Sequence, residues 1–421
     1  MPRASTSQGN VDAEVRELIA AVAEFGSQAL IEQSLRFDGC APSSLVVSPN
    51  ELEKAARHLD SQLRGAIEIA IDRVRRVSQS LISEAKSVEV VPGGVVTNRF
   101  IPVGGAGVYV PGGKASYPSS AVMNVVAAQV AGVSRIVLVS PIRDKETRLP
   151  DAAVMAAAHM LGIEEFLIAG GAGAIAALAY GLPDIGFQSV NAITGPGNRY
   201  VAAAKGQVAS RVAIDSEAGP TEILVLADAT ASPKLVAADL ISQAEHDEAA
   251  AAVLVTDSVD LAHSVSREIS NLLESEPNRD RAEVALSGSQ SAALVCTDWQ
   301  LAIATADAYA AEHLSLQCVD PASVAKQIRN AGAIFLGANS PVSLGDYLAG
   351  SNHVLPTAGA ARRQSALSPL TFLRLQQVIE FDHAALAGSA EAIRALSKAE
   401  GLPAHFSAVS ARLKVGDSEE N

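Results

Sequence analysis

The chain has 421 residues, 48% hydrophobic and only 4% aromatic, which favours two or three domains with α/β cores of Ala, Val, Leu and Ile. Its 32 Lys and Arg against 46 Asp and Glu give a formal charge of −14, which argues against nucleic-acid or anionic-membrane binding. No signal core, CxxC motif or apolar run of roughly 20 residues occurs, so we expect a cytoplasmic protein without a disulfide framework.

The first hundred residues are expected to form a helical N-terminal region, 1–100. Apolar residues recur at helical spacing over 11–38 and 50–87. The run Ser48-Pro49-Asn50-Glu51 is a typical helix start. Residues 88–100 then look extended, with a turn at 92–94.

From residue 101 the pattern changes to short apolar runs that alternate with Ala-rich helical stretches. We expect strands at 136–140, 166–169, 192–194, 223–226, 252–255, 293–295 and 333–336. This alternation predicts two tandem Rossmann-like parallel-sheet domains, 101–218 and 219–366. A mostly helical C-terminal tail, 367–421, follows a polar linker.

Two glycine-rich segments suit ligand binding at strand ends. The run Gly107–Gly113 places a strand before a Pro-Gly-Gly turn, and Gly195-Pro196-Gly197-Asn198 leads into a helix. Such junctions bind ligands in α/β folds, because backbone amides approach the ligand closely. A plain tight turn and a simple N-cap at Asn198 are the alternatives.

Polar residues cluster in three later segments. Gln243 and His246 are three apart, so on a helix they share one face, where an amide oxygen and an imidazole suit zinc. The pair Glu312-His313 suits proton transfer near neutral pH. The loop around Asp346 and His353 is too rich in polar side chains for a mere connector. A lone histidine would more often be structural; the clustering favours an active site instead.

These segments together resemble the histidinol dehydrogenase family over about residues 88–413. The resemblance rests on GVYVPGG, TGPGNRYVAAAK, AIDSEAGPTEILVLAD, DLISQAEHD, AEHL, GDYLAGSNHVLPT and EGLPAH, in this order and spacing. It implies oxidation of L-histidinol through the aldehyde to L-histidine with two NAD, in histidine biosynthesis. It also implies one zinc per site and an intertwined homodimer.

The resemblance assigns roles residue by residue. It implies that zinc is held by Gln243, His246 and Asp346 of one subunit and by His405 of the other. His313 matches the general base, and Glu312 matches the residue that activates water for the aldehyde step. Substrate contacts are implied for the four ligands, the two catalytic residues and Thr221, His353 and Glu400. NAD contacts are implied for Tyr109 and Asn198.

Two positions depart from the family pattern. Gly173 stands where the family usually has a Gln that contacts the nucleotide, and Arg362-Arg363 precede a Gln364-Ser365-Ala366-Leu367 step that is usually Ser-Ser-Gly-Leu. An extra cation near the substrate loop favours an anionic substrate. The alternatives to authentic histidinol dehydrogenase are therefore a paralogous zinc- and NAD-dependent dehydrogenase of another polar primary alcohol, for example a sulfonated diol, and a catalytically inactive metal-binding scaffold.

Overall fold

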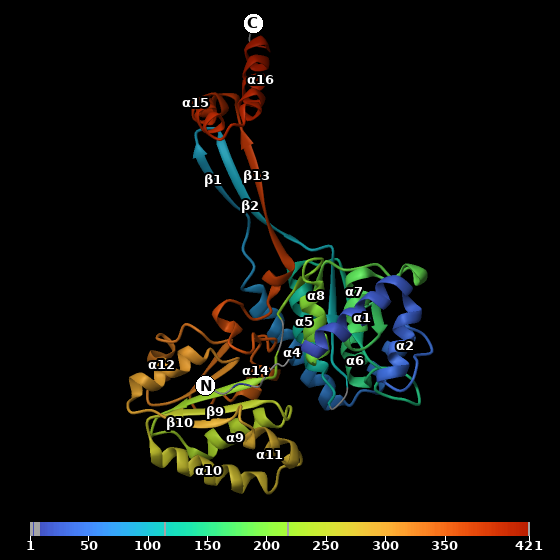
Figure 1. Ribbon diagram of the computed structural model, residues 1–421, viewed down its shortest axis with the longest axis vertical. Helices are drawn as coiled ribbons and strands as arrows, with labels where there is room; N and C mark the ends of the chain where they lie inside the picture. The colour runs from blue at the N-terminus through green and yellow to red at the C-terminus, as the bar shows by residue number, and fades with distance from the viewer. Residues whose placement is uncertain (1–2, 4–8, 113–114, 217–218, 420–421) are drawn as a thin grey trace. The chain divides into compact units, whose positions relative to one another are not determined.

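The computed structural model describes residues 3, 9–112, 115–216 and 219–419; Gly113 of the expected Pro-Gly-Gly turn lies outside them. The described residues form two five-stranded parallel sheets and one three-stranded antiparallel sheet (Figure 1). The chain divides into two compact units, the first comprising Met1–Leu81 and Val103–Phe372 and the second Ile82–Pro102 and Leu373–Asn421.

Four helices open the first unit: α1 Gly9–Phe25, α2 Ser27–Phe37, α3 Pro49–His58 and α4 Ser61–Gln79. The expected helix 11–38 is two helices because Gly26 takes a positive φ of 58° between them. The start signal at Ser48 is confirmed as a capping box, in which the Ser48 and Glu51 side chains accept each other's backbone N–H groups. The expected helix 50–87 breaks at Asp60, whose carboxylate caps α4.

The first parallel sheet has the order β5-β4-β3-β6-β7. Its strands are β3 Gly105–Tyr109, β4 Arg135–Ser140, β5 Glu165–Ile168, β6 Ala192–Thr194 and β7 Ala213–Ile214. The connections contain α5 Pro118–Ala131, α6 Ala152–Met160, α7 Gly171–Tyr180, the 3₁₀ turn η1 Pro183–Ile185 and α8 Arg199–Val208. Successive strands extend from β3 first to one side and then to the other, so the topological switch point lies between β3 and β6.

The second parallel sheet repeats this order as β10-β9-β8-β11-β12. Its strands are β8 Glu222–Ala227, β9 Ala251–Thr256, β10 Ala292–Val295, β11 His313–Gln317 and β12 Ala333–Leu336. Its helices are α9 Pro233–Ala244, α10 Val259–Leu273, α11 Arg279–Ser287, α12 Trp299–Tyr309, α13 Pro321–Ala325 and α14 Val342–Tyr347. Two 3₁₀ turns follow, η2 Ala360–Arg362 and η3 Pro369–Phe372. The predicted α/β fold with two tandem parallel sheets is confirmed.

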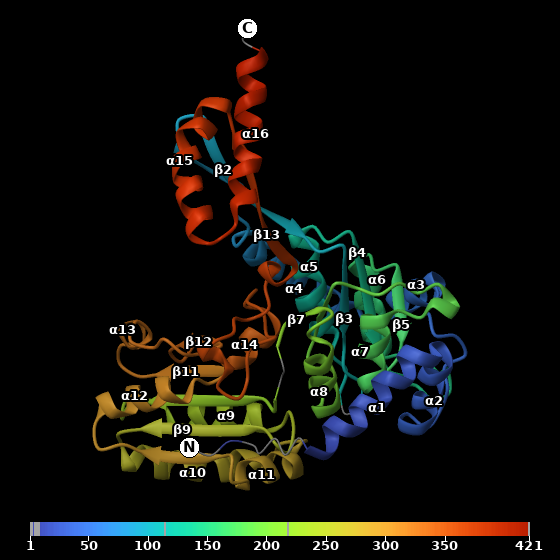
Figure 2. The same ribbon diagram turned by 45° about the horizontal axis from the view of Figure 1, so that its top comes forward.

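Helices cover both faces of each parallel sheet. In the second sheet, α12 lies on one side, and α9 and α10 lie on the other (Figures 1 and 2). Leu224 and Leu226 pack against α12 and α13, whereas Ile223 and Val225 face α9 and α10. Successive strand residues point to opposite faces, so both faces must be apolar. This explains why the strand sequences are continuous apolar runs.

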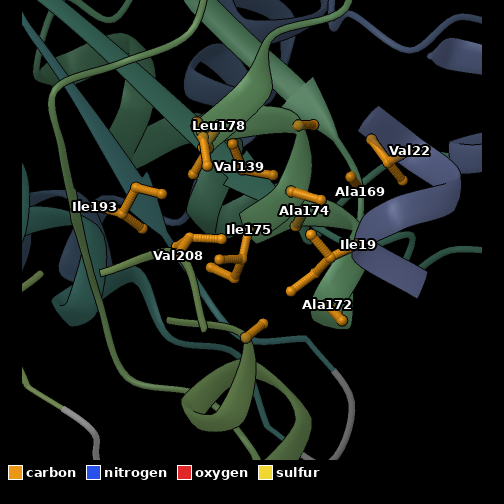
Figure 3. Packing of buried hydrophobic residues seen from close by; sticks show 14 of the residues in the cluster. Ile19, Val22, Val139, Ala169, Ala172, Ala174, Ile175, Leu178, Ile193 and Val208 are labelled. Atoms are coloured by element: carbon orange, nitrogen blue, oxygen red, sulfur yellow. The ribbon is translucent and has the colours of Figure 1, made fainter. Parts of the chain in front are cut away.

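The Ala-rich helix α7 lies at the centre of the first unit's largest apolar cluster. Ile175 and Leu178 of α7 pack near Val139 and Ile193 of the sheet, and Ile19 of α1 lies nearby (Figure 3). A Cβ at Gly107 would lie 2.6 Å from Leu178 Cδ2, so glycine in β3 is needed for this close approach.

The second unit contains a sheet with the order β1-β2-β13 and two helices. These elements are β1 Lys86–Val91, β2 Gly94–Pro102, β13 Leu373–Phe381, α15 His383–Ala399 and α16 Pro403–Glu419. The turn expected at 92–94 joins β1 to β2. The nine-residue strand β13 is a difference from the expected helical tail, and its pairing with β2 joins residues 82–102 to the C-terminal segment rather than to the N-terminal helices.

Candidate active site

Glu312 is held in a buried polar cluster at the start of two neighbouring strands. Its Oε2 accepts hydrogen bonds from Thr221 Oγ1 at 2.6 Å and from the backbone N–H of Glu222 at 2.8 Å. Only 6% of Glu312 is exposed, and burial raises its pKa to about 7, although both hydrogen bonds favour the ionised form. The carboxyl group is therefore balanced between its two protonation states near neutral pH.

His313 begins β11 and lies beside Glu312, with Nδ1 3.5 Å from Glu312 Oε2. Its Nδ1 is also 3.2 Å from the carbonyl oxygen of Glu222, which assigns the ring proton to Nδ1. Nε2 lies 3.8 Å from Asp346 Oδ1. Burial lowers the pKa of His313, so the ring is neutral at pH 7 with Nε2 available as a base.

His353 connects the cluster to the first sheet's helices. Its Nδ1 is 2.9 Å from the Asp346 carbonyl oxygen, and its Nε2 is 3.4 Å from Ser120 Oγ on α5. The neighbouring Asn352 donates to the Met123 carbonyl oxygen at 2.8 Å. Burial lowers the pKa of His353, which keeps this imidazole neutral as well.

Gln243 and His246 lie at the C-terminal end of α9. Gln243 is in the last turn, whereas His246 lies two residues beyond the end of the helix. The expectation that both residues lie on one face of a helix is therefore wrong. The Gln243 amide donates to Thr221 Oγ1 at 2.5 Å, and its Oε1 is buried without a hydrogen-bond partner. His246 places Nδ1 3.0 Å from the Ser242 carbonyl oxygen, which leaves Nε2 as an acceptor.

These donors fit a divalent cation. An unpartnered buried oxygen is costly unless something binds it, and an imidazole nitrogen, an amide oxygen and the Asp346 carboxylate suit zinc. Within the described residues, no three His, Cys, Asp or Glu side chains form a complete metal site by themselves.

The cluster lies at the amino end of the second sheet. Thr221 immediately precedes β8, and Glu312 immediately precedes β11. Ligands in open α/β sheets usually bind at the carboxyl ends of strands. The side chains gathered at this unusual edge come from four separate parts of the sequence: 221, 243–246, 312–313 and 346–353.

The residues matched to NAD contacts lie at the usual place, the switch point of the first sheet. Tyr109 ends β3, and its hydroxyl accepts the backbone N–H of Gly171 at 3.4 Å. Burial raises the pKa of Tyr109 to about 12. Asn198 caps α8 by accepting from the backbone N–H groups of Tyr200 and Val201, which confirms its N-cap role.

A buried ion pair that the sequence analysis missed fixes the loop before α8. Lys205 is paired with Asp215, and the two are 1% and 3% exposed. Lys205 donates to the Gly195 carbonyl oxygen at 3.1 Å, while Asp215 accepts the Gly195 N–H at 2.8 Å. Gly195 has a positive φ of 119°, and a Cβ there would overlap the Tyr109 carbonyl oxygen, so this position requires glycine. The sequence signal that could have indicated this buried pair is the lysine within the Ala-rich run of α8.

The two remaining predicted site residues belong to the second unit. Glu400 is the C-cap of α15, and His405 is in the first turns of α16; both are exposed. Arg363, the cation suspected near the substrate loop, is also exposed. Gly173 is buried in α7.

Comparisons with known proteins decide the family. The histidinol dehydrogenase family model matches residues 1–413. The chain belongs to the histidinol dehydrogenase family. A histidinol dehydrogenase from Mycolicibacterium smegmatis is 50% identical over 98% of this chain and 94% of its own length. One from Nocardia farcinica (strain IFM 10152) is 49% identical over the same shares.

A solved structure agrees with this assignment. The crystal structure of histidinol dehydrogenase from Elizabethkingia anophelis superposes with a TM-score of 0.93 at 32% identity, covering 99% of this chain and 95% of that one. The fold of the described residues is therefore that of a histidinol dehydrogenase, as the resemblance over about residues 88–413 implies. Within the described residues, no helix is both long and apolar enough to cross a membrane.

Proposed function

We propose that this protein oxidises L-histidinol to L-histidine, through the aldehyde, in histidine biosynthesis. The observation that carries the proposal is the pairing of Glu312 with His313 inside the cluster of Thr221, Gln243 and Asp346 in a member of the histidinol dehydrogenase family. The expected cytoplasmic location goes with this proposal.

The two oxidations need two different proton transfers. The first requires a base for the alcohol hydroxyl, and neutral His313 offers Nε2 for that task. The second requires water to attack the aldehyde carbon, and Glu312 with a pKa of about 7 can accept a proton from that water. Thr221 orients the Glu312 carboxylate by its 2.6 Å hydrogen bond.

We propose that zinc is bound by Gln243, His246, Asp346 and the partner's His405, with the unpartnered Oε1 of Gln243 as support. Bound zinc would fix the imidazole and amino nitrogens of the substrate, which is a proximity effect. His353 and Glu400 are proposed to contact the substrate. A neutral imidazole and a carboxylate are suitable hydrogen-bond acceptors for the N–H groups of L-histidinol.

NAD is the proposed hydride acceptor in each oxidation, bound at the switch point of the first sheet. Tyr109 and Asn198 flank that point from β3 and α8. The Lys205–Asp215 pair holds the Gly195 backbone between them, so the loop is ordered before the nucleotide arrives.

We propose a homodimer with shared active sites, supported by an uncovered apolar sheet face in the second unit. Residues opposite each other in an antiparallel pair share a face. Val88 pairs with Val96, Ile379 also pairs with Val96, and Leu375 pairs with Phe100. Leu375 and Ile379 are 58% and 69% exposed, which is unusual for large apolar residues on one sheet face and fits coverage by a second copy.

The proposal is tested by NADH formation with purified, zinc-loaded protein and a panel of primary alcohols. We expect L-histidinol to be the preferred substrate by kcat/KM, with no advantage for anionic alcohols. Preference for a sulfonated diol would favour the paralogous dehydrogenase instead. No turnover of any alcohol by metal-loaded protein would favour the scaffold.

A further inference from the structure

The main chain of Glu222 contacts both proposed catalytic residues. Its N–H donates to Glu312 Oε2 at 2.8 Å, and its carbonyl oxygen lies 3.2 Å from His313 Nδ1. Glu222 begins β8, and the next residue, Ile223, is paired with His313 of β11. A displacement of this one residue would therefore turn both the carboxylate and the imidazole.

The side chain of Glu222 points to the face of the sheet opposite the His313 side chain, where two groups hold it. Arg3 Nη1 lies 3.1 Å from Oε1 and 3.2 Å from Oε2 of Glu222. The Tyr309 hydroxyl donates to Oε2 at 3.3 Å. The Arg3 guanidinium also stacks 4.1 Å from the centre of the Tyr309 ring and donates to the Tyr309 carbonyl oxygen. We call these three residues the Arg3 clamp.

Two of the three residues of the Arg3 clamp are buried, and the Arg3 side chain is 24% exposed. Glu222 is 3% exposed and Tyr309 is 1% exposed, and burial raises the pKa of Glu222 to about 7 although Arg3 and the Tyr309 hydrogen bond lower it. A buried carboxylate requires partners, and the guanidinium and the phenol are the groups supplied here. Tyr309 ends α12, three residues before Glu312, so the clamp holds both the chain just before the catalytic pair and the first residue of the neighbouring strand β8.

We propose that Arg3, Glu222 and Tyr309 are positioning residues that orient Glu312 and His313 through the main chain of Glu222. The proposal rests on the proposed function, because it assigns a purpose to the clamp in that reaction. None of the three need touch substrate. Loss of the clamp leaves the carboxylate and imidazole in place but free to turn, so it lowers the rate of chemistry rather than substrate binding.

Arg3→Ala and Tyr309→Phe test this. A misplacement of 1 Å can cost about 100-fold in rate, so we expect a partial loss of orientation to lower kcat by about 10-fold while KM for L-histidinol and for NAD stays within twofold. Arg3→Lys should recover part of kcat. An ammonium still pairs with Glu222 but cannot keep the hydrogen bonds to both Glu222 and the Tyr309 carbonyl oxygen.

Arg36→Ala is the matched control. Arg36 also pairs with a glutamate, Glu14 at 2.8 Å, and stacks on an aromatic ring, Phe37 at 4.7 Å, away from the catalytic pair. We expect wild-type kcat in this variant. Equal losses of kcat in Arg3→Ala and Arg36→Ala would show a general effect of removing an arginine–glutamate pair and would overturn the proposal.

A spectroscopic measurement tests the clamp without turnover. In ¹⁵N-histidine-labelled protein, His313 should carry its proton on Nδ1, and the signal is assigned by its loss in His313→Asn. We expect Arg3→Ala and Tyr309→Phe to alter that tautomer signal. An unchanged signal together with kcat within twofold of wild type in both variants would refute the positioning role. If wild type makes no NADH from L-histidinol, the proposed function fails, whereas the His313 signal still decides the clamp.

Discussion

The substitution Gly173→Gln introduces the residue that the family usually has at this position. We expect it to destabilise the protein and not to tighten NAD binding. A Cβ at Gly173 would lie 2.5 Å from Gln33 Oε1 and 2.9 Å from Leu30 Cδ1, both on α2. Leu30 is 1% exposed and fixed in the core. Gln33 can turn away only by giving up its 3.0 Å hydrogen bond to the Leu18 carbonyl oxygen. The space at Gly173 is thus already used by α2.

The magnitude follows from three contributions. Losing the Gln33 hydrogen bond costs about 0.5–1.5 kcal/mol. Overpacking against Leu30 costs about 1–3 kcal/mol. Replacing a helical glycine returns at most about 1 kcal/mol. The free energy of unfolding should therefore fall by about 0.5–4.5 kcal/mol.

Urea unfolding and NAD titration of three variants provide the assay. Gly65→Gln is the control, because Gly65 is also helical, in α4, and a Cβ there meets nothing within 4 Å. That variant should be unchanged or slightly more stable. The double variant Gly173→Gln/Gln33→Ala should recover part of the loss. A Gly173→Gln protein as stable as wild type with tighter NAD binding would refute the reasoning.

Four further predictions concern the site and its surroundings. His246→Ala and Asp346→Ala should each lose zinc, and unchanged zinc by metal analysis would show that the ligand set is wrong. His313→Asn should lower turnover by about 10²–10⁴-fold with zinc retained, while Glu312→Gln should mainly impair oxidation of the aldehyde; near-wild-type activity of Glu312→Gln on both alcohol and aldehyde would contradict this division. Mixing inactive His405→Ala and His246→Ala chains should restore activity in mixed dimers, since one site then carries both defects and the other none; verified mixed dimers without activity would place His405 outside the partner's site. Burial raises the pKa of Asp239 to about 6, so its contribution to stability is full below about pH 4 and is lost as pH rises through 6. Asp239→Asn should therefore be more stable than wild type at pH 8, by at most about 3 kcal/mol, with a smaller gap at pH 5; a gap independent of pH would count against this assignment.

Local sequence patterns predicted much of the fold because their causes are local. Apolar runs such as 223–226 and 252–255 became strands, since residues buried on both faces must be apolar throughout. The start signal at Ser48 and the cap at Asn198 depend only on neighbouring residues. The clustering of Glu312-His313 with the Gln243 segment was predictable, because polar side chains within apolar sequence are costly to bury unless they have polar partners.

The remaining features depend on contacts between distant parts of the chain. Strand β13 pairs with β2 across about 270 residues of sequence, and its mixed sequence LRLQQVIEF has no clear pattern of burial. The Arg3 clamp joins residues 3, 222 and 309, and only the structure brings them together. Likewise, nothing near Gly173 in the sequence shows that Gln33 occupies its space.

The most direct test of the proposed function is the number of NADH molecules formed for each L-histidinol consumed, measured with limiting L-histidinol and excess NAD. Because Glu312 and His313 are proposed to serve both oxidations in one site, we predict two NADH and one L-histidine for each L-histidinol, with no accumulation of aldehyde. One NADH per L-histidinol with released aldehyde would contradict the account, and so would the absence of any NADH from zinc-loaded protein.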